Sequence, residues 1–302
     1  MRVPLSTVAV LLASVLVVPA SALRQVVVRT VGHGVRVDVL VTDGGRPVTG
    51  LQAEAFDVFD AGVLQQVDAA EVATHVAVAL VLDTSLSVRV PGYDKVLAAC
   101  EGLVGLLGPG DRAALLAFSD RVTVVVPLTA DRGAVRRGLA AVPRFGAGFV
   151  PRSTVWDAVF AGAALVAEDP GRPLVLLISD GMDNASGLTR DGVARTLADL
   201  GISVDFVRTP WNKGSDDHFG PGPQTPETLP RRTDGVVHDV LDSKLIDRYR
   251  ARLRTLGQAY VLTYIPRGVP TDNGWHELKV TVRKRGVDVK ARPGYYANRG
   301  GR

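Results

Sequence analysis

Oxygen-bearing side chains gather in two short loops that each follow a very apolar segment. The loop 83–87 comes directly after the apolar run 75–82, and the loop 180–183 follows the apolar run 174–178 in the same way. Ligand sites in open α/β sheets lie beyond the carboxyl ends of the strands, so both loops are expected at one edge of a sheet. A third loop ends where a predicted helix begins with a threonine. The oxygen donors are Asp83, Ser85, Ser87, Thr154 and Asp180.

Oxygen donors from three loops are what a hard cation such as Mg²⁺ requires. The Asp-x-Ser-x-Ser spacing presents alternate side chains toward one point. Hydroxyls are neutral, weak ligands, so two carboxylates and two or three hydroxyls leave the ion with residual positive charge and an open coordination position. A carboxylate of another protein can fill that position, whereas a site of four acids would repel it. The sequence therefore predicts a Mg²⁺ site, with Mn²⁺ or Ca²⁺ as alternatives, and an acidic protein partner.

A purely structural interpretation of the same residues stays open. Ser87 and Thr154 are good helix caps, and Asp180 is a common turn residue. Each piece is weakly specific by itself. Their order along the chain, with a threonine opening the intervening helix, favours the metal site.

Strands and helices alternate over residues 73–257, which predicts the α/β domain that would position these loops. Apolar runs indicate the strands, and apolar spacings of three and four indicate the helices. The pattern is typical of a doubly wound, mostly parallel sheet flanked by helices. Cys100 falls on an apolar helix face and is expected in the core. The predicted strands are 75–82, 113–118, 122–126, 174–178 and 202–207, and the predicted helices are 93–107, 131–142, 154–167, 189–200 and 241–256.

The residue patterns at the two ends of the mature chain are typical of β-strands. The N-terminal β region, 23–72, includes strands at 26–28 and 35–41, and the C-terminal β segment, 258–302, includes three strands. Neither has enough strands to be stable alone, so they are expected to pack together as a small β-sandwich-like region. The Gly- and Pro-rich stretch 210–234 is predicted to be an irregular surface excursion.

The first 22 residues predict a secretory signal peptide. Arg2, an apolar run at 8–18 and the ending Ala20-Ser21-Ala22 have the order of such a segment, and the run is too short for a comfortable membrane span. The expected location is periplasmic or extracellular, with no membrane span in the mature chain; a retained anchor is the alternative. A net charge of +4 spread along 302 residues disfavours a nucleic-acid partner.

The loop residues together resemble the metal-ion-dependent adhesion site (MIDAS) of von Willebrand factor A domains. The resemblance extends over about residues 75–257 and includes Gly110-Asp111-Arg112 and Phe118-Ser119-Asp120. Segments 39–43 and 292–295 further resemble exported bacterial proteins called VWFA-related, first noted in Acidobacteria. The resemblance implies the same sheet, a divalent cation and a protein partner.

Residue by residue, the resemblance implies direct ligation by the hydroxyls of Ser85 and Ser87. It implies ligation by Thr154, Asp83 and Asp180 either directly or through bound water, and we expect Asp183 to support the ligands. One departure concerns the residue two before the threonine. A small glycine commonly lies in that loop, but here Arg152 precedes Ser153, and it either crowds or tunes the site.

No enzyme is predicted. The five histidines fall in no recognised catalytic pattern, and the Gly-x-Ser-x-Gly, His-Glu-x-x-His and Walker-type motifs are absent. The sequence predicts a metal-dependent adhesion or assembly module of the bacterial envelope. Its alternatives are a metal-independent scaffolding protein and, more remotely, a metal-assisted hydrolase.

Overall fold

A seven-stranded sheet forms around the two most apolar segments of the chain. Its strand order is β1-β9-β8-β7-β10-β11-β12. All eight residues of the central strands β7 and β10 are buried, as strands covered on both faces must be. β8, β7, β10, β11 and β12 run parallel to one another, whereas β9 pairs antiparallel with β8 and β1 pairs antiparallel with β9. The bounds are β1 Leu16–Val17, β7 Val76–Asp83, β8 Arg112–Phe118, β9 Val122–Thr129, β10 Arg172–Ser179, β11 Ser203–Arg208 and β12 Val237–Asp239.

The computed structural model describes residues 16–17, 34–88, 93–142, 152–209, 227–270 and 274–297. β1 lies within the predicted signal segment, most of which is outside the described residues, as is the strand predicted at 26–28. Most of the predicted excursion 210–234 is also outside them. Its described end is helical instead of irregular: α6, Thr228–Arg232, forms where Leu229 is fully buried in the core.

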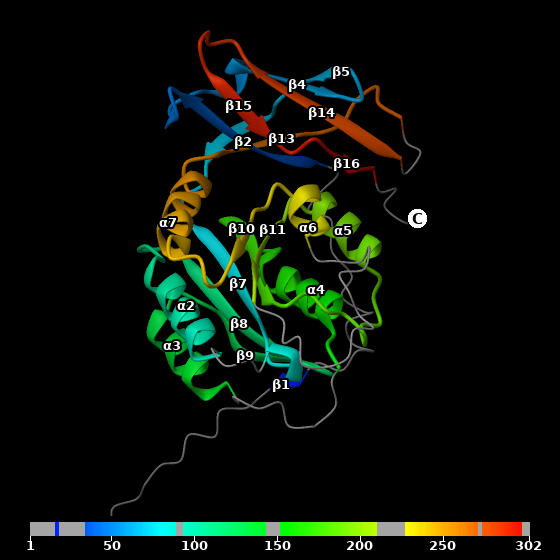
Figure 1. The fold of residues 1–302 in the computed structure, drawn as a ribbon. Coiled ribbons are helices and arrows are strands. Elements are labelled where there is room, and N and C mark those ends of the chain that lie inside the picture. Colours follow the sequence, from blue (N-terminus) through cyan, green and yellow to red (C-terminus); the bar gives the residue numbers. More distant parts are fainter. Residues whose placement is uncertain are drawn as a thin grey trace, which may run out of the picture.

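Helices cover both faces of this sheet (Figure 1). α4 (Val155–Val166) and α5 (Arg190–Asp199) contribute apolar side chains to the core on one face. α2 (Tyr93–Gly105), α3 (Arg132–Ala141) and α7 (Leu245–Leu256) do so on the other face. In the part of the chain described, none of these helices combines the length and apolar character that a membrane crossing needs.

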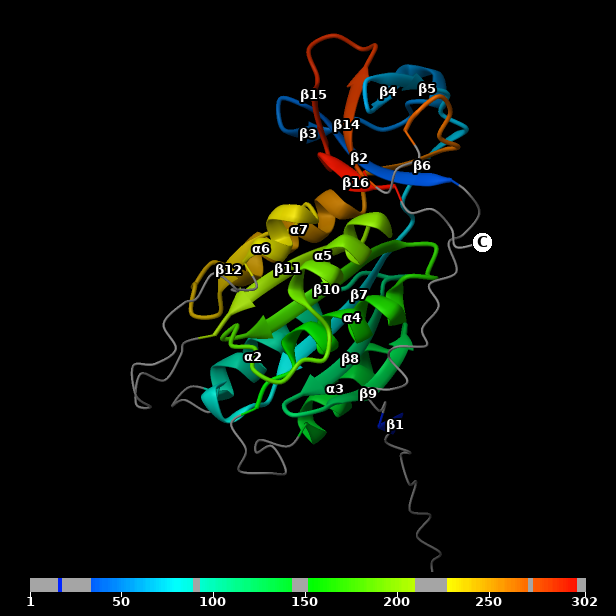
Figure 2. The ribbon, with the colours of Figure 1, turned by 90° about the vertical axis from the view of Figure 1, so that its right-hand side faces the viewer.

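A smaller all-β unit lies at one end of the α/β domain (Figure 2). One sheet has the order β15-β2-β13-β6, with β3 on β2, and the other has the order β16-β14-β4-β5. N-terminal and C-terminal strands alternate in the first sheet and meet at the β14–β4 pair in the second, and the two sheets share one apolar core. The bounds are β2 Val35–Asp43, β3 Arg46–Pro47, β4 Phe56–Asp60, β5 Val63–Gln65, β6 Ala69–Val72, β13 Tyr260–Tyr264, β14 Trp275–Val282, β15 Asp288–Ala291 and β16 Gly294–Tyr296, with a short 3-10 turn at Ala53–Ala55 (η1). A second 3-10 turn, Leu86–Val88 (η2), follows β7 in the α/β domain.

A buried carboxylate ties the two ends of the chain together inside the β unit. Asp60 of β4 is fully buried and lies 2.7 Å from each of three partners. Its oxygens accept hydrogen bonds from the hydroxyls of Tyr264 and Tyr295 and contact Nδ1 of His276. Because buried polar groups are costly unless satisfied, this network helps to specify which strands pair.

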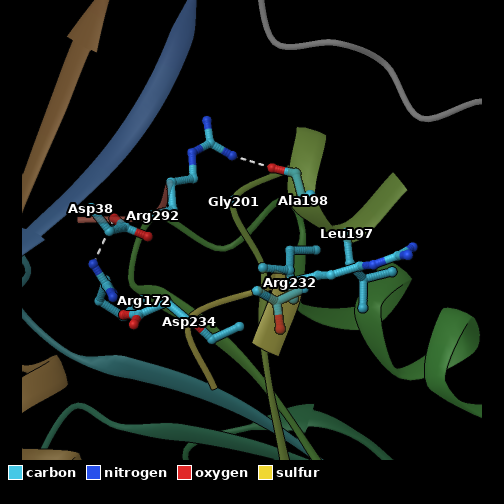
Figure 3. Close-up of a pocket in the computed structure, with 11 residues that line it drawn as sticks. Asp38, Arg172, Leu197, Ala198, Gly201, Arg232, Asp234 and Arg292 are labelled. Carbon is cyan, nitrogen blue, oxygen red and sulfur yellow. Dashed lines mark hydrogen bonds and ion pairs between the residues drawn. The ribbon is translucent and has the colours of Figure 1, made fainter. Parts of the chain in front are cut away.

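Polar contacts join the β unit to the α/β domain. Arg172, the first residue of β10, forms an ion pair with Asp38 of β2 at 2.7 Å. Arg292 donates to the carbonyl of Ala198 near the end of α5, and Figure 3 shows both contacts. The backbone amide of Tyr296 adds a hydrogen bond to the neighbouring Asp199 side chain at 2.8 Å.

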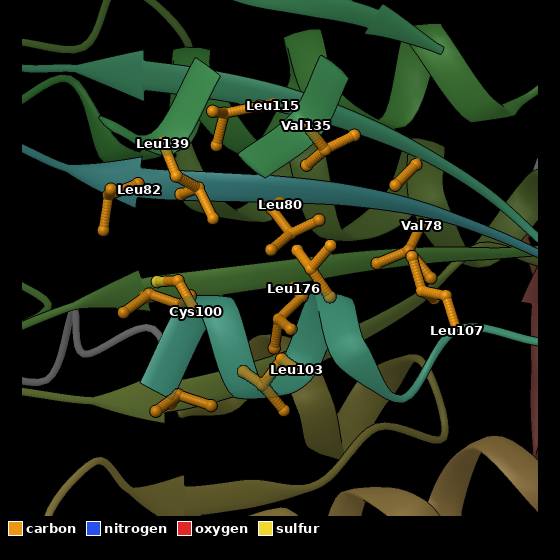
Figure 4. Close-up of a cluster of buried hydrophobic side chains, with 14 of the residues drawn as sticks. Val78, Leu80, Leu82, Cys100, Leu103, Leu107, Leu115, Val135, Leu139 and Leu176 are labelled. Carbon is orange, nitrogen blue, oxygen red and sulfur yellow. The ribbon is translucent and has the colours of Figure 1, made fainter. Parts of the chain in front are cut away.

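Cys100 lies in the core that α2 forms with the sheet (Figure 4). It is fully buried among residues such as Leu82 and Leu103, and burial raises the pKa of its thiol to about 12. A thiol in that environment is a packing group and a poor nucleophile. The expectation of a core cysteine is confirmed.

Candidate metal centre

The loop after β7 begins with the first predicted ligand. Asp83 ends the strand, and its side chain is fully buried. Its Oδ1 accepts a 2.8 Å hydrogen bond from the backbone amide of Ser85, and its Oδ2 accepts one from the hydroxyl of Ser179. The turn places the Ser85 and Ser87 hydroxyl oxygens 3.1 Å apart. One carboxylate and two hydroxyls are thus held close together at the end of β7.

The second carboxylate comes from the loop after β10. Oδ1 of Asp180 accepts a hydrogen bond from the Met182 amide at 3.0 Å, and Gly181 follows in a left-handed conformation at φ 88°. Oδ2 of Asp180 is buried and has no hydrogen-bond partner in the part of the chain the structure describes. A buried carboxylate oxygen without a donor is costly, and a cation would satisfy it.

Among the described residues, no positively charged side chain is a cause of the pKa shift of either carboxylate. Burial and, next in size, the nearby charge of Asp180 raise the pKa of Asp83 to about 7, against hydrogen bonds from Ser179 and Ser85 that lower it. Burial likewise raises the pKa of Asp180, and the adjacent Ser87 hydroxyl lowers it. Like charges in a desolvated site disfavour ionisation of both groups. The pair is therefore suited to a divalent cation.

Thr154 reaches this region through the end of β8. Its hydroxyl and its amide both donate to the carbonyl of Ser119, at 3.0 and 2.9 Å. The carbonyl of Phe118 accepts from the amide and hydroxyl of Thr84, at 2.8 and 2.9 Å. Three loops therefore meet at the ends of neighbouring strands. Hydrogen bonds link Asp83 to Ser85 and Ser85 to Ser87, and the Ser87 hydroxyl is adjacent to Asp180. Thr154 is joined to these four ligands through Ser119 and Phe118 at the end of β8.

The loop after Asp180 also fixes the start of α4. Oδ1 of Asp183 accepts from the amide of Val155 at 2.8 Å, and the Ser186 hydroxyl accepts from Trp156 at 3.0 Å. In return, the Asp157 carboxylate of α4 accepts hydrogen bonds from two amides of this loop. Asp183 thus supports the helix that carries Thr154 at its N-cap.

Sequence analysis missed two members of this helix-capping group. Asn184 accepts a 2.8 Å hydrogen bond from the Ser153 amide, and Ser186 caps α4 as described. The Asp-x-x-Ser spacing of Asp183 and Ser186 was a usable signal, because such polar pairs often satisfy helix ends. Their partner helix, however, lies some thirty residues earlier in the chain.

The remaining side chains near the centre differ in their exposure to solvent. Arg152 is exposed, so it lies at the surface of the loop. Leu86, between the two serines, is 43% exposed, whereas Trp156 is buried in the core.

The donor set fits a hard cation and little else. In the described ranges, no three His, Cys, Asp or Glu side chains gather as a metal-binding group. A site here would consist of two carboxylates plus hydroxyls, which is oxygen chemistry and suits Mg²⁺ or Mn²⁺ better than softer metals.

Comparison with protein families agrees with this arrangement. Residues 78–182, from β7 through the second acidic loop, match the sequence profile of the von Willebrand factor type A domain. The chain contains a von Willebrand factor A domain. The matched segment holds all five predicted ligands. A search of curated proteins finds no match.

Several solved structures resemble the chain at low identity. Protein BatB from Bacteroides thetaiotaomicron is 16% identical, with a TM-score of 0.46 over 61% of this chain and 98% of that one. Proximal thread matrix protein 1 from the mussel byssus, in a form with a zinc-occupied MIDAS motif, is 16% identical, with a TM-score of 0.48 over 64% and 48%. A von Willebrand factor type A protein from Catenulispora acidiphila is 11% identical, with a TM-score of 0.48 over 88% and 74%.

Asp183→Ala should destabilise the von Willebrand factor A domain by about 0.5–2 kcal/mol, because it removes an acceptor for the first turn of α4. Asp183→Asn keeps an acceptor oxygen and should lose less. Urea denaturation in the presence of a chelator measures both. Equal free energies of unfolding for Asp183→Ala and the unsubstituted protein would contradict this role.

Asp83→Asn should raise the melting temperature of the metal-free protein at pH 8 but not at pH 4. The folded-state pKa of Asp83 is raised to about 7 from an ordinary value of 3.8. Folding therefore favours the protonated acid, and the unsubstituted protein loses stability as the pH rises between those values. The amide of asparagine carries no charge and avoids that loss.

Thermal denaturation in chelator at pH 4, 6 and 8 measures the difference between the two proteins. It should grow from near zero to several degrees. A difference that is independent of pH would show that the Asp83 carboxylate bears no ionisation cost in the folded protein.

Proposed function

We propose that this protein is a metal-dependent protein-binding module of the bacterial envelope, which captures an acidic group of a partner. The observation that carries the proposal is the buried Oδ2 of Asp180, which lacks a hydrogen-bond partner in the described chain and lies in the same site as the protonation-prone Asp83. Two desolvated carboxylates flanked by hydroxyls form a site that is completed by a cation. The divalent cation is Mg²⁺, with Mn²⁺ as its chemical substitute.

Each ligand has a distinct part in the proposed site. Asp83 and Asp180 supply the negative charge, and hydrogen bonds from Ser85, Ser179 and Met182 fix their orientation. Ser85 and Ser87 supply neutral oxygens, and Thr154 is the fifth ligand. When bound, the cation offers an electrophilic position to an incoming carboxylate.

The surroundings of the site suit a protein partner. Leu86 exposes an apolar side chain beside the metal-binding serines, and the exposed Arg152 stands two residues before Thr154. A carboxylate flanked by an apolar side chain would find both the metal and a hydrophobic contact there. We further propose export through the secretory pathway, on the strength of the N-terminal segment 1–22 and its processing-site pattern.

Mn²⁺ should bind the purified protein at one site, and a blocked aspartate should then bind the metal. Isothermal titration calorimetry measures the metal. Water-proton relaxation of the Mn²⁺ complex measures the second step with N-acetyl-aspartyl-amide, since a carboxylate that enters the coordination sphere displaces relaxing water. The N-acetyl-asparaginyl-amide control should leave the relaxation unchanged.

Asp83→Ala should weaken Mn²⁺ binding at least tenfold, whereas Asp120→Ala, which removes an exposed acid on the nearby β8–β9 turn, should not. Absence of metal binding in the unsubstituted protein would favour the scaffolding alternative. Metal binding without any response to the blocked aspartate would retain the metal site and reject carboxylate capture.

A further inference from the structure

The outer edge of β9 lacks the residues that usually protect an exposed strand. Beyond β9 the main sheet continues only with the two-residue strand β1, among the described residues. The first five residues of β9, 122–126, are Val-Thr-Val-Val-Val, without proline, glycine or a charged side chain. Proteins commonly use charges and prolines to stop other strands from pairing with an exposed edge. The edge over 122–126, the strand-docking edge, is therefore suited to a further strand.

Apolar packing covers both faces of β9 at this point. Val122 and Val126 are 4% and 9% exposed. Val124 packs against the core that includes α4, and Val125 packs against the core that includes α2 and α3. The side chains of β9 are thus committed to the two cores, and its outward-facing backbone groups are what it can still offer a partner. A partner strand with apolar side chains on both faces would continue the sheet.

One segment of the chain already pairs with the strand-docking edge. β1 runs antiparallel to β9, with Leu16 opposite Val124 and Val17 opposite Thr123. Thr123 in turn lies opposite Ala117 of β8, and Ala117 lies opposite Leu82, the residue before the first predicted metal ligand. The pairing therefore takes place at the end of the sheet that carries the metal centre, where Figure 1 also places β1.

The register of this pair defines a longer match between the two segments. Continued in both directions, it sets residues 14–18, Ser-Val-Leu-Val-Val, opposite residues 122–126. Pro19 and Pro127 then fall one position beyond the two ends of the match. Proline cannot donate a backbone hydrogen bond, so these two residues bound a five-residue ladder. Both stretches are rich in β-branched residues, which favour strands.

We propose that the strand-docking edge binds an extended apolar strand, and that residues 14–18 are its occupant while the N-terminal segment is attached. Backbone hydrogen bonds supply the affinity, and the valine and leucine side chains continue the two apolar faces of the sheet. Removal of residues 1–22, the export signal proposed above, vacates the edge. The docking uses none of the five predicted metal ligands, so it is independent of the metal.

Hydrogen exchange followed by mass spectrometry, in the presence of a chelator, compares the chain 1–302 with the chain 23–302. The outward-facing amides of 122–126 should exchange at least tenfold faster in the shorter chain, because they lose their hydrogen-bond partners. A synthetic peptide of residues 13–18, with lysines added at both ends for solubility, should restore the slow exchange. The same peptide with Leu16→Pro should not restore it.

Thr123→Lys in the chain 23–302 should weaken binding of the peptide at least tenfold, because a lysine on an edge strand opposes pairing. Thr281→Lys, at a similarly half-buried threonine of β14 in the β unit, is the matched control and should leave binding unchanged.

Two results would overturn the proposal. The first is equal exchange of 122–126 in the two chains without any response to the peptide. The second is slow exchange of 122–126 in the chain 23–302 alone, together with a dimer in analytical ultracentrifugation, which would assign the strand-docking edge to a second copy of the chain instead of to residues 14–18.

Discussion

The repulsion between two desolvated carboxylates at the ends of β7 and β10 is the constraint on which the proposed site depends. Asp83 and Asp180 lie where hydrogen bonds from hydroxyls and amides only partly offset burial. A protein surface would relieve such a pair with water, and a core would replace it with apolar side chains. A pair retained at the end of two fully buried strands is best explained by a ligand that carries positive charge.

The fold serves that pair by bringing three loops to one edge of the sheet. Parallel pairing of β7 with β8 and β10 aligns the strand ends, and the carbonyls of Phe118 and Ser119 then link the first loop to Thr154. Reciprocal hydrogen bonds between α4 and the second acidic loop fix the helix start. The β unit attaches to the α/β domain through polar contacts at the start of β10 and the end of α5. The metal centre lies at the opposite ends of the strands, so the β unit does not cover it.

Local patterns were sufficient for much of the α/β domain. Apolar runs predict β7 and β10 because fully covered strands need no polar alternation. Apolar spacings of three and four predict α2 and α4 because they place apolar side chains on the helix face that packs in the core. The von Willebrand factor A resemblance is confirmed by the family match over 78–182. The narrower kinship with exported VWFA-related proteins stays a prediction.

Features that depend on distant contacts were not predictable. α6 forms because Leu229 is buried by tertiary packing, although its surrounding sequence has the composition of a loop. The network of Asp60 joins residues more than 200 positions apart, and its members become neighbours only through strand register. The cap that Ser186 forms on α4 was likewise not predictable from local sequence, because α4 lies about thirty residues earlier in the chain.

The most direct test of the central claim is the structure of the protein crystallised with Mn²⁺, with the ion located by its anomalous scattering. The account predicts one manganese peak in contact with Ser85 and Ser87 and with Oδ2 of Asp180, either directly or through water. A well-ordered loop with no peak, and with Asp180 Oδ2 satisfied by a protein donor, would contradict it.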